Sequence, residues 1–406
     1  MMRKPLGRRR VTAAVMVGAG LIVAFLGVPD LPTASPVPIS DYVQYWAASR
    51  VNLAGGNPYD WHELLAAERE AEPSLPTPVM MWNPPWTLSL VLLPSLLPYL
   101  PSRTLWLVVS GLVLAASARL LWSYWGGRSQ QLAPVIVLAL VFPPSVFALV
   151  MGQISPLLLL GIAGFLVFEK KGRPGAAGAV AAVTLVKPQV VYLLWAALLI
   201  WSLHGRQWRF LGGAAASVAA MSLLPLVTNP GVFLDYVHAV RERTPDYFVT
   251  PTLGTFLRLL VSWEYSWLMF APAIIGVGWL VVHWHTQGRA WDWSNRISLV
   301  LLLSVVTSPY VWLFDQVILL LPALQVAAAH GRLPSRATKV ALGVYGAAAA
   351  AAFVMLAWNV NVRDVAGGSS GLLREAITTP NMFWHVTIAP VLLAGFILFL
   401  RKGHHR

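Results

Sequence analysis

Twelve apolar runs, separated by short polar breaks, limit this chain to folds that lie in a lipid bilayer. Hydrophobic residues make up 57% of the sequence and charged residues only 11%, against roughly 25% charged residues in soluble domains. Several runs are shorter than the ~20 residues that span a membrane, so their ends are approximate. We therefore predict an all-α polytopic membrane protein with about twelve transmembrane helices, at 11–28, 104–125, 131–149, 154–168, 174–186, 189–203, 209–227, 267–285, 296–307, 312–328, 338–358 and 382–400.

Two apolar segments, one of them outside the twelve runs, need separate treatment. Residues 86–100 are interrupted by Pro94 and Pro98, and proline breaks helices, so we expect a half-buried or re-entrant segment there. Run 11–28 follows a basic start, as in a signal peptide. Because many apolar runs follow, we expect an uncleaved first helix.

The net charge of +13 arises from basic residues scattered between apolar runs. This distribution favours cytoplasmic membrane loops over a nucleic-acid surface, and we expect no nucleic-acid partner. With both termini cytoplasmic, most of the Lys and Arg lie inside, and among the acidic residues only Glu169 and Asp292 do. The positive-inside rule therefore predicts a multi-pass plasma-membrane protein whose large outer loops are 29–102, 228–266 and 359–381.

The first outer loop contains an acidic group that we expect on the solvated face of a short amphipathic helix. A metal site is a weaker alternative because no histidine pair accompanies the acids, and we expect neither a metal nor a cofactor. The chain has no cysteine, which excludes disulfides and thiolate ligands. The acidic group comprises Asp60, Glu63, Glu68, Glu70 and Glu72.

The polar stretch Ser40 to Trp46 opens this same loop and places a carboxylate at the membrane surface. Asp41 is expected to begin a helix that carries Tyr45 one turn later and that ends at Gly55-Gly56-Asn57-Pro58. Asp41 could be a catalytic residue, or its carboxylate could cap the helix by accepting backbone N–H hydrogen bonds.

Other motifs place a helix-breaking residue beside a polar side chain at the start of an apolar run. In the predicted topology they all lie in or just beneath outer loops, where polar groups near hydrocarbon are costly and indicate function. The alternative is that each satisfies a neighbouring helix end. The polar residues are Asn83 and Tyr59, Gln153 in Met151-Gly152-Gln153-Ile154-Ser155-Pro156, Lys187 before Pro188, and Ser308 and Asp315 in Ser308-Pro309-Tyr310-Val311-Trp312-Leu313-Phe314-Asp315.

In order and spacing, these motifs resemble those of glycosyltransferase family 87, from about Ser40 to Pro322. The resemblance implies one integral membrane domain over residues 1–406, a GT-C-like helix bundle with outer-face loops and short interfacial helices. It also implies an enzyme that transfers a hexose, with mannose as the expected sugar, from a polyprenyl-phosphate carrier to a hydroxyl of a glycolipid or glycan acceptor on the outer face. Some relatives carry histidine near Phe314, where this chain has none.

Transfer from a phosphate to an alcohol needs a base, and one carboxylate suffices for a single inverting displacement. We assign Asp41 to this role. The departing phosphate needs a cation; Lys187 is the main candidate, with snorkelling as its alternative, and Arg258 is a second one. We expect Gln153, Asn83, Asp315, Tyr45 and Tyr59 to bind substrate, with Asp315 either on sugar hydroxyls or paired with Lys187.

The same features also allow a lipid or sugar carrier of the flippase type, or a non-catalytic family member. A transporter should show paired half-sequences and polar residues spread across its depth. The predicted clustering of polar groups on one face favours the enzyme.

Overall fold

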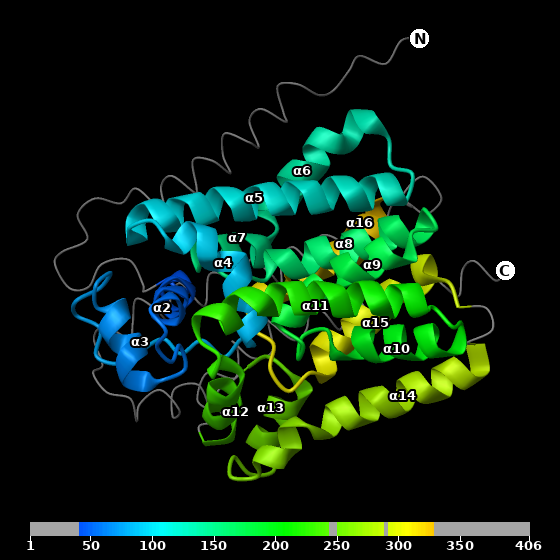
Figure 1. Cartoon of the computed structure of the whole chain (residues 1–406). Helices are drawn as coiled ribbons and strands as arrows, with labels where there is room; N and C mark the ends of the chain where they lie inside the picture. The colour runs from blue at the N-terminus through cyan, green and yellow to red at the C-terminus, as the bar shows by residue number, and fades with distance from the viewer. Residues whose placement is uncertain (1–39, 243–249, 288–290, 329–406) are drawn as a thin grey trace.

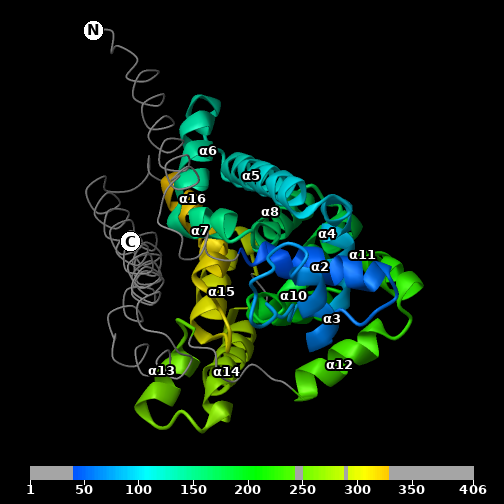
Figure 2. The same cartoon turned by 90° about the vertical axis from the view of Figure 1, so that its left-hand side faces the viewer.

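The computed structural model describes residues 40–242, 250–287 and 291–328, which form helices and no strand. The predicted helices at 11–28, 338–358 and 382–400 lie outside these residues. Figures 1 and 2 show a bundle of long helices, among them α5 (Tyr99–Tyr124), α8 (Pro156–Lys170) and α11 (Trp208–Thr228), that run roughly side by side. The shorter helices α2 (Tyr42–Leu53), α3 (Trp61–Glu68) and α12 (Val232–Glu242) gather at one end.

The apolar runs within the described residues all form helices, as predicted, although four of them are divided. Runs 267–285 and 312–328 each begin as a 3₁₀-helix and continue as an α-helix. Run 131–149 is bent by 58° between Val141 and Pro143, and run 174–186 changes from α-helix to 3₁₀-helix at Ala182. The α-helices of the bundle are α5 (Tyr99–Tyr124), α6 (Leu132–Val141), α7 (Pro143–Val150), α8 (Pro156–Lys170), α9 (Pro174–Ala181), α10 (Tyr192–His204), α11 (Trp208–Thr228), α14 (Ala271–Gln287), α15 (Trp293–Thr307) and α16 (Leu320–Ala328).

Three segments of the described chain are long and apolar enough to cross a membrane, and the bent α6–α7 pair would make a fourth. The three are Tyr99–Tyr124, Trp208–Thr228 and Ser266–Thr286. The other helices of the bundle are shorter. The structure thus shows an all-helical protein of membrane character, while the number of twelve crossings stays a prediction.

The proline-interrupted segment does not cross the bundle. It forms the 3₁₀-helix η1 (Pro85–Thr87) and then α4 (Leu88–Ser95), which packs against α2, α5 and α11. Eight residues of α-helix extend about 12 Å, far less than the ~30 Å hydrocarbon core. The predicted re-entrant geometry fits this short helix.

The short helices outside the long bundle are α2 (Tyr42–Leu53), α3 (Trp61–Glu68), α12 (Val232–Glu242) and α13 (Leu253–Leu260), with the 3₁₀-helix η4 (Ser266–Met269) leading into α14. Four members of the predicted acidic surface of α3 are at least partly exposed, but Glu68 is fully buried, which corrects its assignment to a solvated face. Its Oε2 accepts a hydrogen bond from the backbone N–H of Val79 at 2.9 Å. Burial raises the pKa of Glu68 to about 8.

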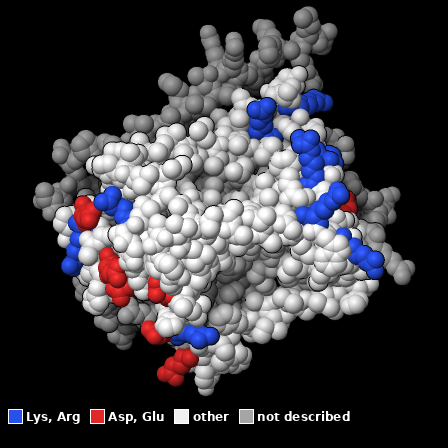
Figure 3. Space-filling view, in the orientation of Figure 1, with Lys and Arg blue, Asp and Glu red and all other residues white. Residues whose placement is uncertain are grey.

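The two ends of the bundle differ in charge. One end holds the carboxyl ends of α5 and α8, tied by a hydrogen bond from Lys170 Nζ to the carbonyl oxygen of Tyr124 at 3.0 Å, and basic residues gather there (Figure 3). Acidic residues gather at the other end, around α3 and α12, where Lys and Arg side chains are also present, and an uncharged belt separates the two ends (Figure 3). The exposed basic residues at the first end are Arg119, Arg128, Lys170, Lys171, Arg173, Arg206 and Arg209.

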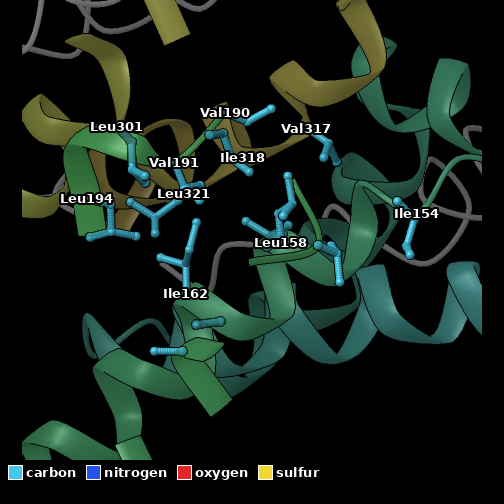
Figure 4. Close-up of a cluster of buried hydrophobic side chains, with 14 of the residues drawn as sticks. Ile154, Leu158, Ile162, Val190, Val191, Leu194, Leu301, Val317, Ile318 and Leu321 are labelled. Atoms are coloured by element: carbon cyan, nitrogen blue, oxygen red, sulfur yellow. The ribbon is translucent and has the colours of Figure 1, made fainter. Parts of the chain in front are cut away.

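The core lies between α8, α10, α15 and the 3₁₀-helix η6 (Leu313–Leu319) that leads into α16 (Figure 4). Leu158, Ile162, Leu194 and Leu301 meet there and are almost completely buried. Fully burying such a side chain stabilises the fold by roughly 1.5–3 kcal/mol. This core fixes the starts of α8 and α10 and the end of α15, which carry the polar motifs.

Candidate active site

The carboxylate of Asp41 stands at the start of α2 without capping it. Asp41 occupies the N-cap position, but its side chain makes no capping hydrogen bond. The hydroxyl oxygen of Ser40 instead accepts from the backbone N–H of Tyr42 at 3.3 Å. The predicted helix start is confirmed, and the capping role of Asp41 is wrong, which leaves this partly exposed carboxylate available for other contacts.

Gly152 allows the loop before α8 to approach the start of α2. Its backbone has φ +63°, and a Cβ there would lie 2.6 Å from the Cβ of Tyr42. Both the left-handed conformation and the close approach require glycine. Trp106 Nε1 donates to the Gly152 carbonyl oxygen at 2.9 Å and the Ser40 hydroxyl donates to that of Met151 at 3.1 Å, so both α5 and the residue before Asp41 hold the loop in place.

The Gln153 side chain connects Asp41 to Lys187. Its Nε2 donates to Oδ2 of Asp41 at 2.6 Å. Its Oε1 accepts from the Tyr45 hydroxyl at 2.9 Å and from Lys187 Nζ at 2.8 Å. Two donors on one oxygen fix the orientation of the amide, because only an acceptor can satisfy them.

Lys187 lies at a break between two helices. The 3₁₀-helix η3 (Ala182–Val186) ends there, and α10 begins five residues later. The residue before a proline is driven out of the helical region, and Lys187 has φ −137° and ψ 70° before Pro188. Its side chain is buried and does not snorkel to the surface.

The ammonium group of Lys187 forms an ion pair with Asp315. Nζ lies 2.7 Å from Asp315 Oδ1 and also donates to Ser155 Oγ at 3.1 Å. Together with the bond to Gln153, these contacts occupy all three N–H groups of the ammonium. Nζ also lies 4.5 Å from the centre of the Phe314 ring, a favourable cation–π distance.

Asp315 is satisfied on both carboxylate oxygens. Oδ1 accepts from Lys187 and from the Ser155 hydroxyl at 2.6 Å, and Oδ2 accepts from the backbone N–H of Trp312 at 3.0 Å. The predicted pairing with Lys187 is therefore confirmed. Leu313 begins the 3₁₀-helix, and Asp315 lies in its first turn, not deep within the predicted helix 312–328.

Asp41 belongs to a charged environment that alters its basicity. Burial raises the pKa of the Asp41 carboxyl to about 6, partly offset by the Gln153 hydrogen bond and the Lys187 charge, while the Asp315 charge raises it further. At pH 7 the carboxylate is still mostly ionised, yet it is more basic than an ordinary aspartate. Such a value suits a general base near neutral pH.

Asn83 and Tyr59 stabilise the helix break at Lys187 through hydrogen bonds to the backbone. Asn83 Nδ2 donates to the carbonyl oxygen of Val186 at 2.8 Å, and the Tyr59 hydroxyl donates to that of Asn83 at 2.8 Å. Ser308 ties the end of α15 to the same break, since its hydroxyl donates to the carbonyl oxygen of Gln189 at 2.7 Å. These side chains therefore hold the backbone that carries Lys187.

Arg258 is placed differently from the other predicted residues. It is buried in α13, where its Nε donates to the carbonyl oxygen of Trp263 at 3.0 Å and its Nη1 contacts the sulfur of Met269 at 3.0 Å. Its guanidinium also lies 4.0 Å from the centre of the Trp263 ring. None of these contacts joins it to the cluster around Lys187.

Two members of this cluster were not predicted as site residues. Ser155 bridges Lys187 and Asp315, and Phe314 lies against the ammonium. Both stand inside the motifs that drew attention to Gln153 and Asp315, so proximity in sequence was the available signal. In the described part of the chain, no three His, Asp or Glu side chains gather as a metal site would require.

Comparison with known proteins identifies the chain. Residues 81–309, more than half of its length, match the family model of glycosyltransferase family 87. No curated protein and no solved structure gives a match. The matched stretch contains Gln153 and Lys187, as the resemblance of the motifs implied. The protein thus belongs to glycosyltransferase family 87 and is a glycosyltransferase.

Proposed function

We propose that this glycosyltransferase moves a hexose, mannose in the first instance, from a polyprenyl-phosphate carrier to a hydroxyl of a glycolipid or glycan, with Asp41 as the general base. The observation that supports the proposal most is the position of Asp41. Gln153 holds one carboxylate oxygen, and the other, Oδ1, makes no hydrogen bond to the described residues. A partly exposed, basic oxygen held at a fixed position can accept the proton of an incoming alcohol.

The reaction is a single displacement. The acceptor oxygen attacks the anomeric carbon while its proton passes to Oδ1 of Asp41. The bond from the anomeric carbon to the phosphate oxygen breaks, and its electron pair leaves with the polyprenyl phosphate. The departing phosphate needs a cation, a role for which the sequence put forward Lys187 and Arg258. Tyr45, Tyr59, Asn83 and Gln153 remain proposed contacts of the substrates.

The charge distribution supports an orientation. Basic ends of membrane proteins face the cytoplasm, and the basic end of this bundle contains the carboxyl ends of α5 and α8 (Figure 3). Asp41 and Lys187 belong to the opposite end, beside the amino ends of α8 and α10. We therefore place the reaction on the outer face of the plasma membrane, with both termini in the cytoplasm.

A reconstituted transfer assay tests the proposed function. The purified protein in lipid vesicles is supplied with polyprenyl-phosphate mannose, polyprenyl-phosphate glucose or a nucleotide-linked mannose, each with a panel of glycolipid and glycan acceptors. We expect transfer from the mannosyl lipid and none from the nucleotide sugar. Transfer from the nucleotide sugar alone would contradict the lipid-linked donor, and preference for the glucosyl lipid would replace mannose as the sugar.

A further inference from the structure

The contacts of Lys187 bear on whether this residue binds the donor phosphate directly or acts through the side chains around it. A phosphate ligand needs an N–H group that can point at the phosphate. Lys187 Nζ already donates to Gln153 Oε1 at 2.8 Å, Ser155 Oγ at 3.1 Å and Asp315 Oδ1 at 2.7 Å. Its positive charge is also balanced by the Asp315 carboxylate.

Release of Lys187 towards a phosphate would be costly. Asp315 is 1% exposed, and leaving a buried charge without its partner strongly destabilises a fold. Trp312 and Ser155 would then remain as the hydrogen-bond donors to Asp315. The ion pair with Asp315 therefore favours an ammonium group of Lys187 that keeps its present position.

A fixed ammonium has a defined effect on Gln153. If Lys187 were absent, the Tyr45 hydroxyl would be the one remaining donor to Gln153 Oε1 described here. The amide would then lose a contact that keeps its Nε2 directed at Asp41. The bond from Nε2 to Oδ2 at 2.6 Å engages one carboxylate oxygen of Asp41, and Oδ1 makes no hydrogen bond to the described residues.

We propose that Lys187, Asp315 and Ser155 form a positioning unit that orients Gln153, and through it the Asp41 carboxylate, and that Lys187 does not contact the donor phosphate. This inference rests on the proposed role of Asp41. It revises the function of the lysine: the cation that balances the phosphate must come from elsewhere in the protein or from the medium.

The unit also sets the protonation of Asp41. The groups that act on the Asp41 carboxyl are Gln153 and Lys187, which lower its pKa, and Asp315, which raises it; Tyr45 is the other titratable side chain nearby. Lys187 lowers the pKa of Asp41 by more than Asp315 raises it. Removal of both residues therefore takes away a net lowering of this pKa, and it also weakens the hydrogen bond from Gln153 to Asp41. The pKa of Asp41 should therefore rise, and the acidic limb of the rate profile should move to higher pH.

The experiment compares the native protein with the double variant Lys187→Met/Asp315→Asn, in which no unpaired buried charge remains, and with Ser155→Ala. Ser145→Ala is the matched control, because the Ser145 hydroxyl is buried without a hydrogen-bond partner. For each protein we would measure kcat and KM for the mannosyl lipid from pH 5 to pH 9 and the Kd for polyprenyl phosphate. The infrared carbonyl band of protonated Asp41, assigned by subtraction of the Asp41→Asn spectrum, gives its titration midpoint without turnover.

For the double variant we expect kcat to fall at least tenfold, the acidic limb and the infrared midpoint to move to higher pH, and KM and Kd to stay within threefold. Ser155→Ala should show the same changes in smaller degree, and Ser145→Ala should match the native protein. A tenfold rise in Kd with an unmoved midpoint would overturn the inference and make Lys187 a phosphate ligand. If the native protein transfers no sugar, the proposed function fails, and the infrared midpoint alone decides whether the unit controls Asp41.

Discussion

Replacement of Asp41 by asparagine is expected to lower kcat for sugar transfer by about 10²–10⁴-fold, the usual contribution of a general base. Asparagine has nearly the same shape and can still accept the Gln153 hydrogen bond, but its amide cannot take the acceptor proton. The Kd for polyprenyl phosphate should stay within threefold of the native value. Initial rates in lipid vesicles and binding of the phosphate carrier provide the two measurements.

Asp60→Asn is the control for this prediction. Asp60 is also an acid at a helix start in the loop predicted to lie outside, but its side chain caps α3 through the N–H groups of His62 and Glu63. Asparagine is an equally good cap, so this variant should retain native activity. An Asp41→Asn protein that transfers sugar at the native rate would remove Asp41 as the base, while membership of the family would stand.

The second large effect concerns stability. Lys187→Met leaves the Asp315 carboxylate buried without its cation, and breaking a buried pair in this way costs about 3–5 kcal/mol. The double variant Lys187→Met/Asp315→Asn should recover most of this loss because both charges are gone. Thermal unfolding in lipid should show a fall in Tm of roughly 10 °C for the single variant and a much smaller one for the double variant.

The comparison of single and double variants excludes a general packing effect. If loss of the lysine stem were the cause, the double variant would be at least as unstable as the single one. Equal Tm values for all three proteins would show that the ion pair contributes nothing to the fold. Either result would contradict the view that Lys187 and Asp315 form a coupled pair.

Much of the helical framework could be predicted from the sequence because hydropathy is a strong signal. Every apolar run in the described residues became a helix, and the proline-rich segment before α5 became a short packed helix. The number of crossings could not be settled in the same way. Helices such as α8 and α15, with 15 residues each, are shorter than ~20-residue spans.

The residues of the site could be predicted from the sequence, but most of the hydrogen bonds that join them could not. Asp41, Gln153, Lys187 and Asp315 stood out as polar residues beside helix breaks, and all four join one network. Gln153 meets Asp41 across more than a hundred residues of sequence, and no local pattern indicates that distance. The sequence offered an ion pair between Lys187 and Asp315 as one alternative, but it could not show that all three N–H groups of Lys187 are occupied in the fold.

Glu68 shows the opposite error. Its neighbours in sequence are charged and lie at the surface, which suggested a solvated position. The segment around Val79 folds over it and supplies one hydrogen bond to its carboxylate. Composition of a short amphipathic helix does not reveal which later loop will cover one of its side chains.

The stereochemistry of the product tests the central claim most directly, namely that one carboxylate assists a single displacement at the anomeric carbon. The one-bond carbon–hydrogen coupling at that carbon, measured by NMR for the donor and for the purified product, reports the two configurations. The account predicts that the product has the anomeric configuration opposite to that of the donor. Retention of the donor configuration would require a second displacement with its own nucleophile, and would contradict the role assigned to Asp41.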